Sequence, residues 1–369
     1  MRAKNEFTRR DFLVASSGLS AAWALSLSFP LHVLPESLAE DPRVAATPLL
    51  DKGFASVRQI GRGVYATLAD SSKGLQAVCN GGFLVGTDAA LLFEGHMTPA
   101  GAAFELEALR LVSSVPVRVA LNSHYHFDHS FGNAFYGAQG IPLWAHTRTA
   151  ELLVEKYAAL QGRDKATLYE PLRKRLRDAT SEEERERVKK DIGVFDWIYS
   201  SVDAALIALP NRRLDPAEFP LPVDLGGLSA VLEAHPGHTP GDIIVRVPDQ
   251  NIVFAGDLLF NGSYPASFDV DMKAWRAALE TFAAFSPDTL FVPGHGPLCG
   301  QEGIAAQRAL FDDLYEYAQR SFRAGLPLLE AQRRFQVPAR FASYPIFSWN
   351  LTIEAALAKF YQEFAGKKK

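Results

Sequence analysis

The stretch His124-Tyr125-His126-Phe127-Asp128-His129 places four potential metal ligands within six residues, in the pattern HxHxDH. Imidazole nitrogens and carboxylate oxygens together suit zinc and other first-row transition metals. Two residues before the motif, the run Val117–Leu121 ends. It is mainly branched and apolar and predicts a buried strand. The ligands therefore begin where a strand ends and the chain turns, which suits a site that is firmly held and open.

The spacing of these ligands indicates how many metal ions they hold. If the segment were extended, His124, His126 and Asp128 would share one face and His129 would point away. One metal centre cannot readily take all four side chains from so short a loop. Two adjacent centres can, with the first two histidines on one and the Asp-His pair on the other. The pattern therefore favours two metal ions.

Three further ligand candidates follow or interrupt apolar runs later in the chain. They are His238 in the motif HTPGD, Asp257 in FAGD and His295 in VPGHG. Each is bracketed by Gly or Pro, which permit tight turns and unusual backbone angles. Sandwich and α/β enzymes build their sites where strand ends meet at one edge of a sheet. We therefore expect these segments to converge with the HxHxDH motif.

In this order, the motifs HxHxDH, HTPGD, GD and PGHG resemble those of the metallo-β-lactamase superfamily, over roughly residues 54–298. The resemblance implies an α/β fold, an αββα sandwich with two mixed sheets face to face and helices outside. It implies a first metal ion on His124, His126 and His238. It implies a second on Asp128, His129 and His295, with Asp257 bridging the two. Two zinc ions are the default cofactors that it implies, with iron or manganese as alternatives.

Other polar residues near the motifs have less certain roles. Glu94 stands in a strand-end turn where many relatives carry Asp, so its longer side chain leaves a supporting role beside the metal open. Asp242 is expected to orient a histidine. His96, His146 and His235 either support the ligands or have structural roles, and the structural role is favoured for all three.

The N-terminus has the pattern of an export signal. Thr8-Arg9-Arg10-Asp11-Phe12-Leu13 is a twin-arginine motif, and a weakly apolar segment leads from it to the small residues Ser37-Leu38-Ala39. Residues 1–39 are therefore predicted to be a signal peptide for the Tat translocase, which places the mature protein in the periplasm. The alternative is an uncleaved anchor, but Pro30 and many Ser and Gly residues make a poor spanning helix. No stable membrane span is expected after cleavage.

Net charge and cysteine content limit the binding partners and the disulfides that the sequence predicts. The formal net charge is −4, and removal of four basic and three acidic residues with the signal shifts it to about −5. No basic stripe indicates nucleic-acid binding, so a small-molecule substrate is expected. A disulfide between Cys79 and Cys299 is permitted in the periplasm, but the sequence cannot place the two within bridging distance. The sequence leaves the oligomeric state open.

Apolar periodicity predicts one main domain over residues 40–300. Strand-like runs occur at 64–68, 82–86 and 89–93, followed by a helix at 102–113 with Leu106, Leu109 and Val112 on its apolar stripe. A strand-helix-strand order is typical of layered α/β folds. The second half has the same plan, with a helix at about 271–285.

Two helical parts depart from this plan. Residues from about 149 to 210 predict a charged insertion, which is either a lid carrying Tyr157, Trp197 or Tyr199 over the site or a hairpin packed by these aromatics. Residues 301–369 predict a C-terminal helical extension. It either reaches across the mouth of the site, covers the sandwich or makes a dimer contact, and Phe347 and Trp349 are pocket candidates for which packing is favoured.

The ligand set predicts hydrolysis. A metal-bound water has a pKa near 7 and supplies hydroxide at neutral pH, while Asp128 or Asp257 passes a proton. The leading interpretation is an exported dinuclear metal-dependent hydrolase that uses a metal-bound hydroxide on an ester, thioester, lactone or amide of a small molecule. The alternatives are a metallo-β-lactamase that hydrolyses β-lactams, a mononuclear iron persulfide dioxygenase, and an accessory protein of a periplasmic redox system.

Overall fold

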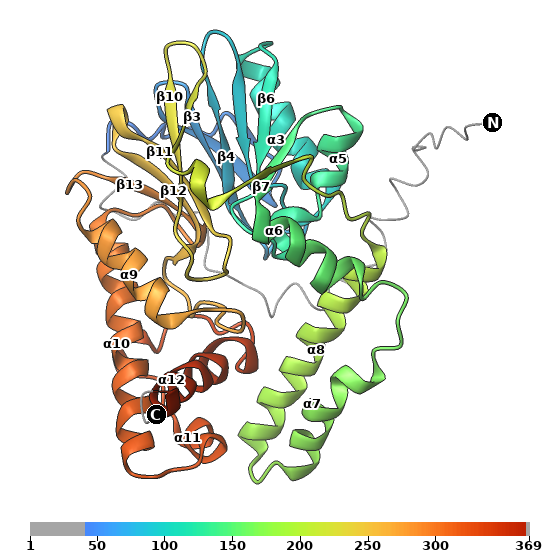
Figure 1. Ribbon diagram of the computed structural model, residues 1–369, viewed down its shortest axis with the longest axis vertical. Helices are drawn as coiled ribbons and strands as arrows, with labels where there is room; N and C mark the ends of the chain where they lie inside the picture. The colour runs from blue at the N-terminus through green and yellow to red at the C-terminus, as the bar shows by residue number, and fades with distance from the viewer. Residues whose placement is uncertain (1–40, 367–369) are drawn as a thin grey trace.

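The computed structural model describes residues 41–366 and folds them into two β-sheets with helices outside (Figure 1). The α/β sandwich predicted from the sequence is confirmed. The twin-arginine motif and the rest of residues 1–39 lie outside the described residues. Within residues 41–366, no helix is both long and apolar enough to cross a membrane.

The first sheet carries the HxHxDH motif at the end of one of its central strands. Its eight strands follow the order of the chain, with antiparallel neighbours up to β5 and parallel neighbours after it. The strands are β1 (Leu50–Asp51), β2 (Ala55–Gly61), β3 (Val64–Ala69), β4 (Gly81–Val85), β5 (Ala90–Phe93), β6 (Val117–Leu121), β7 (Leu143–His146) and β8 (Arg212–Leu214).

The second sheet carries the other three ligand candidates. Its order is β13-β12-β11-β10-β9, and its neighbours are antiparallel except for the parallel pair β12 and β13. The strands are β9 (Leu221–Asp224), β10 (Ser229–Ala234), β11 (Ile243–Val247), β12 (Ile252–Phe260) and β13 (Leu290–His295). Strand β12 is buried at every position, which fits a central strand covered on both faces.

The helices cover the outer faces of the sheets or extend beyond them. The α-helices are α3 (Pro99–Val112), α4 (Phe127–Ser130), α5 (Asn133–Ala138), α6 (Thr147–Leu152), α7 (Ala166–Asp178), α8 (Glu182–Ala204), α9 (Met272–Ala283), α10 (Gln301–Arg323), α11 (Leu328–Arg334) and α12 (Ala355–Gly366). Shorter 3-10 or π-helical segments are η2 (Leu153–Ala158), η3 (Pro216–Glu218), η4 (Pro248–Gln250), η5 (Ala339–Phe341) and η6 (Asn350–Glu354).

Three apolar cores follow from this layering. One lies between the sheets, where Phe93 and Leu121 of the first meet Phe254 and Val292 of the second. A second lies between the first sheet and α3, and a third joins the second sheet to α9, α10 and α12. The strand ends that carry the ligands are therefore held on both sides by packed side chains.

Helix α3 differs from the prediction in its start and in its buried face. It begins at Pro99, three residues before the predicted start, because Thr98 caps it by accepting a hydrogen bond from the Gly101 N–H. Its buried face holds three small residues together with Phe104, Glu105 and Leu109, whereas Val112, predicted on the apolar stripe, is 38% exposed. Small side chains let the helix lie close to the sheet, and its last turn projects beyond that contact.

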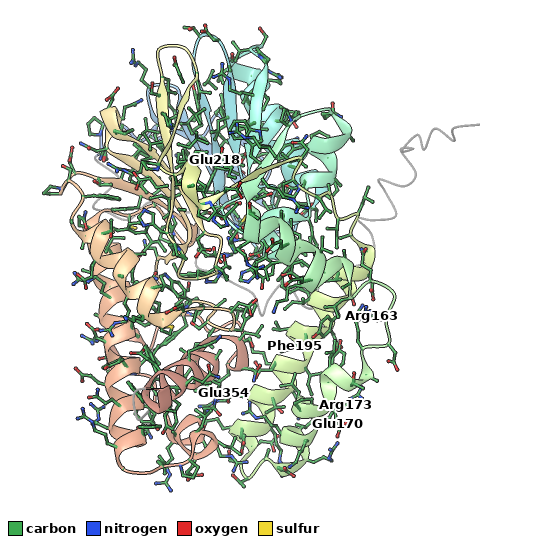
Figure 2. The ribbon with its side chains drawn as sticks, viewed as in Figure 1. Arg163, Glu170, Arg173, Phe195, Glu218 and Glu354 are labelled. Atoms are coloured by element: carbon green, nitrogen blue, oxygen red, sulfur yellow. The ribbon has the colours of Figure 1, made fainter. Side chains whose placement is uncertain are left out.

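The insertion and the C-terminal extension lie on the same side of the sandwich (Figure 1). The insertion is the antiparallel hairpin of α7 and α8, and the extension contains α10, α11 and α12. Glu354 lies on the part of the extension that faces the hairpin (Figure 2), where its carboxylate accepts hydrogen bonds from Arg175 of α7. Asp191 of α8 accepts hydrogen bonds from the Ser348 hydroxyl and the Asn350 N–H. Polar contacts thus join two parts far apart in sequence.

Candidate metal centre

The HxHxDH motif is not extended over its whole length. Strand β6 ends at Leu121, and the one-turn helix α4 begins at Phe127, the fourth residue of the motif. The extended geometry considered from sequence therefore does not hold beyond His126. The helical turn brings Asp128 Oδ2 to 3.6 Å from His129 Nε2, so that both side chains reach one location.

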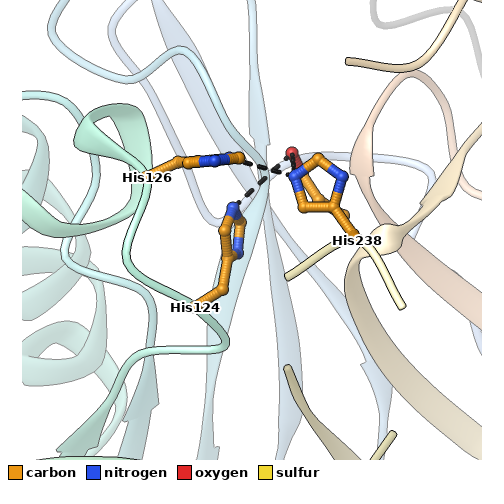
Figure 3. A group of neighbouring side chains, drawn as sticks. His124, His126 and His238 are labelled. Atoms are coloured by element: carbon orange, nitrogen blue, oxygen red, sulfur yellow. Dashed lines mark hydrogen bonds and ion pairs between the residues drawn. The ribbon is translucent and has the colours of Figure 1, made fainter. Parts of the chain in front are cut away.

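Three histidines and one aspartate form the first candidate metal group. Potential ligand atoms of His124, His126, His238 and Asp257 all lie within 4.8 Å of one another, and all four side chains are buried. Figure 3 shows the three histidine rings turned toward a common point. His238 Nε2 is 3.0 Å from His126 Nδ1 and 3.3 Å from Asp257 Oδ2. This arrangement could hold one metal ion with nitrogen and oxygen ligands.

A second candidate group lies beside the first. Its members are Asp128, His129 and His295, whose ligand atoms also lie within 4.8 Å of one another. Asp257 joins it through its other oxygen, because Oδ1 lies 3.1 Å from His129 Nε2 and 3.4 Å from His295 Nε2. One oxygen of Asp257 thus faces each group, which is the geometry of a bridging carboxylate. The structure brings together all seven residues of the predicted ligand set.

The buried polar atoms of this cluster fit metal ions. His124 Nε2, His129 Nε2 and Asp257 Oδ1 are buried and make no hydrogen bond in the described structure. Buried polar atoms normally have a partner, so their convergence favours a ligand that satisfies them together. Burial lowers the pKa of His126 to about 4 and that of His238 to about 3, so both imidazoles are neutral at pH 7 and can coordinate.

Glu94 contacts a ligand candidate of the cluster, a supporting role that its longer side chain had left open in the sequence. It follows β5 and has a positive φ of 83°, a strained conformation for a residue with a side chain. Its Oε1 lies 3.1 Å from His129 Nδ1, and its Oε2 accepts a hydrogen bond from the Ser123 N–H. The left-handed turn gives the longer carboxylate its place behind His129. Glu94, His124 and His129 also form a third group that could hold a metal ion.

Asp242 orients His238 through the backbone rather than through its ring. Its carboxylate accepts hydrogen bonds from the N–H groups of Gly237 and Thr239, which flank the histidine, and from the Thr239 hydroxyl. Burial raises the pKa of Asp242 to about 8. The HTPGD motif is therefore a closed turn that fixes the position of its histidine.

Gly294 allows Asp257 to occupy its place between the two groups. A Cβ atom on Gly294 would lie 2.0 Å from Asp257 Oδ1 and 2.8 Å from the Gly256 carbonyl carbon. Gly256 itself has a φ of 52°, and the register of β12 and β13 shifts on both sides of it. The glycines of the GD and PGHG motifs thus let the two strands carry ligands without a collision.

A buried polar chain behind the ligand loop was missed by sequence reasoning. Cys79 Sγ donates to the Asp128 carbonyl oxygen at 3.1 Å and lies 3.7 Å from His96 Nδ1, and His96 Nε2 is 2.9 Å from Glu105 Oε2. Burial opposes the charge on His96, but the adjacent Glu105 carboxylate raises its pKa to about 10. The sequence feature that could have indicated this chain was Glu105, an acidic residue on the buried face of α3. His96 is therefore more than a turn residue, because it connects the outer helix to the ligand loop.

The remaining histidines have structural contacts. His146 caps α6, where its Nδ1 accepts a hydrogen bond from the Arg148 N–H, and His235 lies 3.1 Å from Glu233. The favoured structural role agrees with these contacts. Both cysteines are free and buried, so Cys79 and Cys299 form no disulfide here.

A pocket with about 500 Å³ of empty space, part of it open to solvent, lies over the cluster. Its polar floor consists of His126, Asp128, Asp257 and His295. Every other lining residue is apolar except for the indole N–H of Trp197, which makes no hydrogen bond within residues 41–366. The sandwich side contributes Val78, Phe127, Phe260, Ala266 and Phe268, and the two helical parts contribute Trp197, Ile198, Phe347 and Leu351.

The aromatic candidates of the insertion have different positions. Trp197 lines the pocket, with its ring 5.1 Å from that of Phe127. Tyr157 packs against Tyr125 and Phe131, next to the ligand loop. Tyr199 packs against Tyr169 of α7.

In the C-terminal extension, Phe347 lines the pocket, although packing was favoured for it. Trp349 packs against Phe335 and lies under the Arg187 guanidinium. Only tertiary structure separates these residues, because a pocket aromatic and a core aromatic give the same sequence signal.

The fold and the cluster define a class of protein, an α/β sandwich with a candidate metal centre between strand ends, and sequence comparison identifies its family. The sequence model of the metallo-beta-lactamase superfamily matches residues 76–295, more than half of the chain. The chain therefore belongs to the metallo-beta-lactamase superfamily.

Individual relatives match only parts of the sequence. An uncharacterized protein of Mycobacterium tuberculosis is 33% identical over 82 residues, which are 20% of this chain and 37% of that protein. A hydroxyacylglutathione hydrolase of Acidiphilium cryptum is 31% identical over 96 residues, which are 26% of this chain and 38% of that enzyme. The chain thus spans less than two fifths of the length of these curated relatives.

Among solved structures, a stereoselective inverting sec-alkylsulfatase from Pseudomonas sp. has a similar fold. Its TM-score is 0.56 at 17% identity, and the match covers 95% of this chain and 63% of the alkylsulfatase. At this identity the likeness concerns the fold alone. It includes nearly the whole described chain, so the helical parts belong to the shared architecture.

Proposed function

We propose that the protein is an exported hydrolase that uses two metal ions, with zinc as the default, to cleave an ester, thioester, lactone or amide of a small molecule. The observation that carries this proposal is the position of Asp257, whose two oxygens face two separate groups of buried ligands. A site of this kind suits hydrolysis because both the attacking water and the leaving group can be held. The hydroxyacylglutathione hydrolase among the relatives supports the same class of reaction.

The roles of the residues follow from their positions. His124, His126 and His238 would hold the first ion, and Asp128, His129 and His295 the second, with Asp257 shared. When bound, the ions lower the pKa of a coordinated water and polarise the bond to be cleaved. Asp128 forms part of the pocket floor, where its carboxylate can accept a proton from the attacking water and return it to the leaving group.

The metal content of the purified mature protein tests the proposal first. Plasma mass spectrometry should find about two zinc ions per chain, and turnover of a simple ester or thioester should require them. One iron per chain, with oxygen consumption on persulfides, would favour a dioxygenase instead. Rapid turnover of nitrocefin would favour a β-lactamase. A protein that binds no metal after reconstitution would leave only an accessory role.

The proposed export has a separate test. The double substitution Arg9→Lys and Arg10→Lys should retain the protein in the cytoplasm at its full length, because the twin-arginine pair is what the translocase reads. Cell fractionation and the mass of the exported protein measure both the location and the cleavage near residue 39. Equal export of the wild type and the variant would contradict the Tat assignment.

A further inference from the structure

The walls above the metal cluster have an unusual composition for a site that handles polar bonds. Within residues 41–366, the pocket lining holds no lysine or arginine, and its only ionisable side chains are the four ligand candidates of the floor. The rest of the lining is hydrocarbon or aromatic ring. A substrate group that packs against these walls exchanges water for apolar surface and finds no charged partner on them.

Three cations of the segments that form or flank the pocket walls already have partners. Arg175 is paired with Glu354, and Lys190 donates to the Ile346 carbonyl oxygen next to Phe347. Lys156 pairs with Asp269, the residue after Phe268. These cations stabilise the walls rather than the contents of the pocket. An anionic substituent that lies against the walls, away from the floor, would therefore lack a cationic partner, which is unfavourable next to apolar surface.

From this distribution we propose that the pocket binds a hydrophobic, uncharged acyl or alkyl group of the substrate. The cleaved bond rests on the proposed function, whereas the choice of substrate rests on the walls. The substrate class is then esters, thioesters or amides that carry a hydrocarbon chain or ring. Peptide-like thioesters such as those of glutathione are poor candidates, since their carboxylates and ammonium group would need charged partners.

Trp197 and Phe347 set the extent of the pocket from opposite parts of the chain. Trp197 belongs to α8, is 7% exposed and meets Phe127 edge to face. Phe347 precedes η6 and is half-buried, and it packs in the same small apolar cluster as Trp197. Because these two rings come from the insertion and the extension, the sandwich alone does not close the pocket.

Binding of straight-chain alcohols measures the pocket without any reaction. In calorimetric titrations of the full mature protein, with and without zinc, the affinity should rise about fourfold for each methylene from 1-butanol through 1-hexanol to 1-octanol. The heat-capacity change of binding should be negative, as for burial of apolar surface. An affinity that does not depend on chain length would overturn the proposal.

Substitution of a wall residue adds a gain of function. Phe347→Arg places a cation in the wall. It should therefore lower the affinity for 1-octanol at least tenfold and raise the affinity for 8-hydroxyoctanoate relative to the wild type. Phe195→Arg is the matched control, because Phe195 is a half-buried aromatic of α8 that does not line the pocket (Figure 2). It should leave both affinities within about twofold. Equal effects of the two variants would contradict the assignment.

A series of 4-nitrophenyl esters from acetate to octanoate separates this inference from the proposed function. A kcat/KM that rises with chain length supports both. Length-dependent alcohol binding without turnover of any ester contradicts the hydrolase and supports the pocket. Turnover without dependence on chain length supports the hydrolase and contradicts the pocket.

Discussion

The metal cluster and the pocket walls are built in opposite ways. Six of the seven ligand candidates lie on a strand end, in turns or on a one-turn helix of the sandwich, Asp257 lies within strand β12, and all seven belong to short motifs. Four of the wall residues lie on two helical parts about 150 residues apart in sequence. The cluster is thus fixed by local turns on a rigid core, whereas the walls depend on the docking of two distant parts. The chemistry at the cluster and the selection of the substrate by the walls can therefore vary independently in this fold.

The largest expected effect is on the cluster. Asp257→Asn removes the charge from the carboxylate that faces both groups, so the metal content should fall at both sites. We expect kcat/KM to fall by more than about 100-fold, which exceeds the loss expected for a residue that only supports a ligand. Plasma mass spectrometry and ester kinetics measure this. Circular dichroism should remain unchanged.

Asp249→Asn, on the exposed segment η4, is the matched control for that substitution. Its metal content and kinetics should equal those of the wild type. If the Asp257 variant retained two metal ions, the cluster would not depend on this carboxylate, and the contrast between cluster and walls would be contradicted.

A smaller but still large effect is expected from Gly294→Ala. The added methyl would overlap Asp257 Oδ1 and the neighbouring backbone, so the carboxylate must move. We expect a 10–100-fold loss of zinc affinity and a loss of about 1–3 kcal/mol of stability from overpacking. Zinc titration with a competing chelator measures the affinity. Gly137→Ala is the control, because its nearest atom would be 4.0 Å away; equal behaviour of the two would show that Asp257 is not held by this contact.

Glu94→Gln tests whether the carboxylate behind His129 supports the ligand. We expect about a tenfold loss of affinity for one of the two zinc ions, because Glu94 makes the His129 ring a better ligand. Stepwise zinc release measured against chelator concentration distinguishes one weakened site from two. Glu107→Gln, at an exposed position of α3, should have no effect. A uniform loss at both sites would assign Glu94 to the fold rather than to His129.

Arg175→Met should affect the walls and spare the cluster. It leaves the buried Glu354 carboxylate without its cation, which should cost about 1–3 kcal/mol of stability and loosen the docking of the insertion on the extension. KM for long-chain esters should rise severalfold, while metal content stays at the wild-type level. The neighbouring Arg173→Met, exposed on α7 (Figure 2), is the control. Loss of metal in the Arg175 variant would mean that cluster and walls are coupled.

The smallest effect on activity is expected at Asp191, where only stability should depend on pH. Burial raises the pKa of Asp191 to about 6 from its usual 3.8. The folded state therefore holds a proton more tightly than the unfolded state, and this contribution to stability declines as pH rises from about 4 to about 6, by at most about 3 kcal/mol. The difference in melting temperature between the wild type and Asp191→Asn should shift in the same pH range. A constant difference between pH 4 and 8 would contradict the shift.

Sequence and structure agree best where ligand chemistry coincides with a strand end. Strand β6 and the HxHxDH motif were predicted from adjacent residues, and the structure places the motif as expected beside His238 and His295. The start of α3 was missed because apolar periodicity outweighed the capping signal of Thr98 and Pro99. Of the predicted stripe, Leu109 is buried and Leu106 packs against the same core, whereas Val112 was wrong because the last turn of the helix projects beyond the sheet.

The sequence by itself determined the ligand types, their order and a layered α/β fold, because short motifs and strand periodicity are local properties of the chain, while the sandwich followed from the family resemblance. Tertiary structure alone decided that Asp257 divides its oxygens between two groups, that Glu94 reaches His129, and that Cys79, His96 and Glu105 form a chain behind the ligand loop. It also decided that Trp197 and Phe347 share one pocket. The physical reason is that these contacts join residues distant in sequence, and their distances depend on how sheets and helices pack rather than on any local pattern.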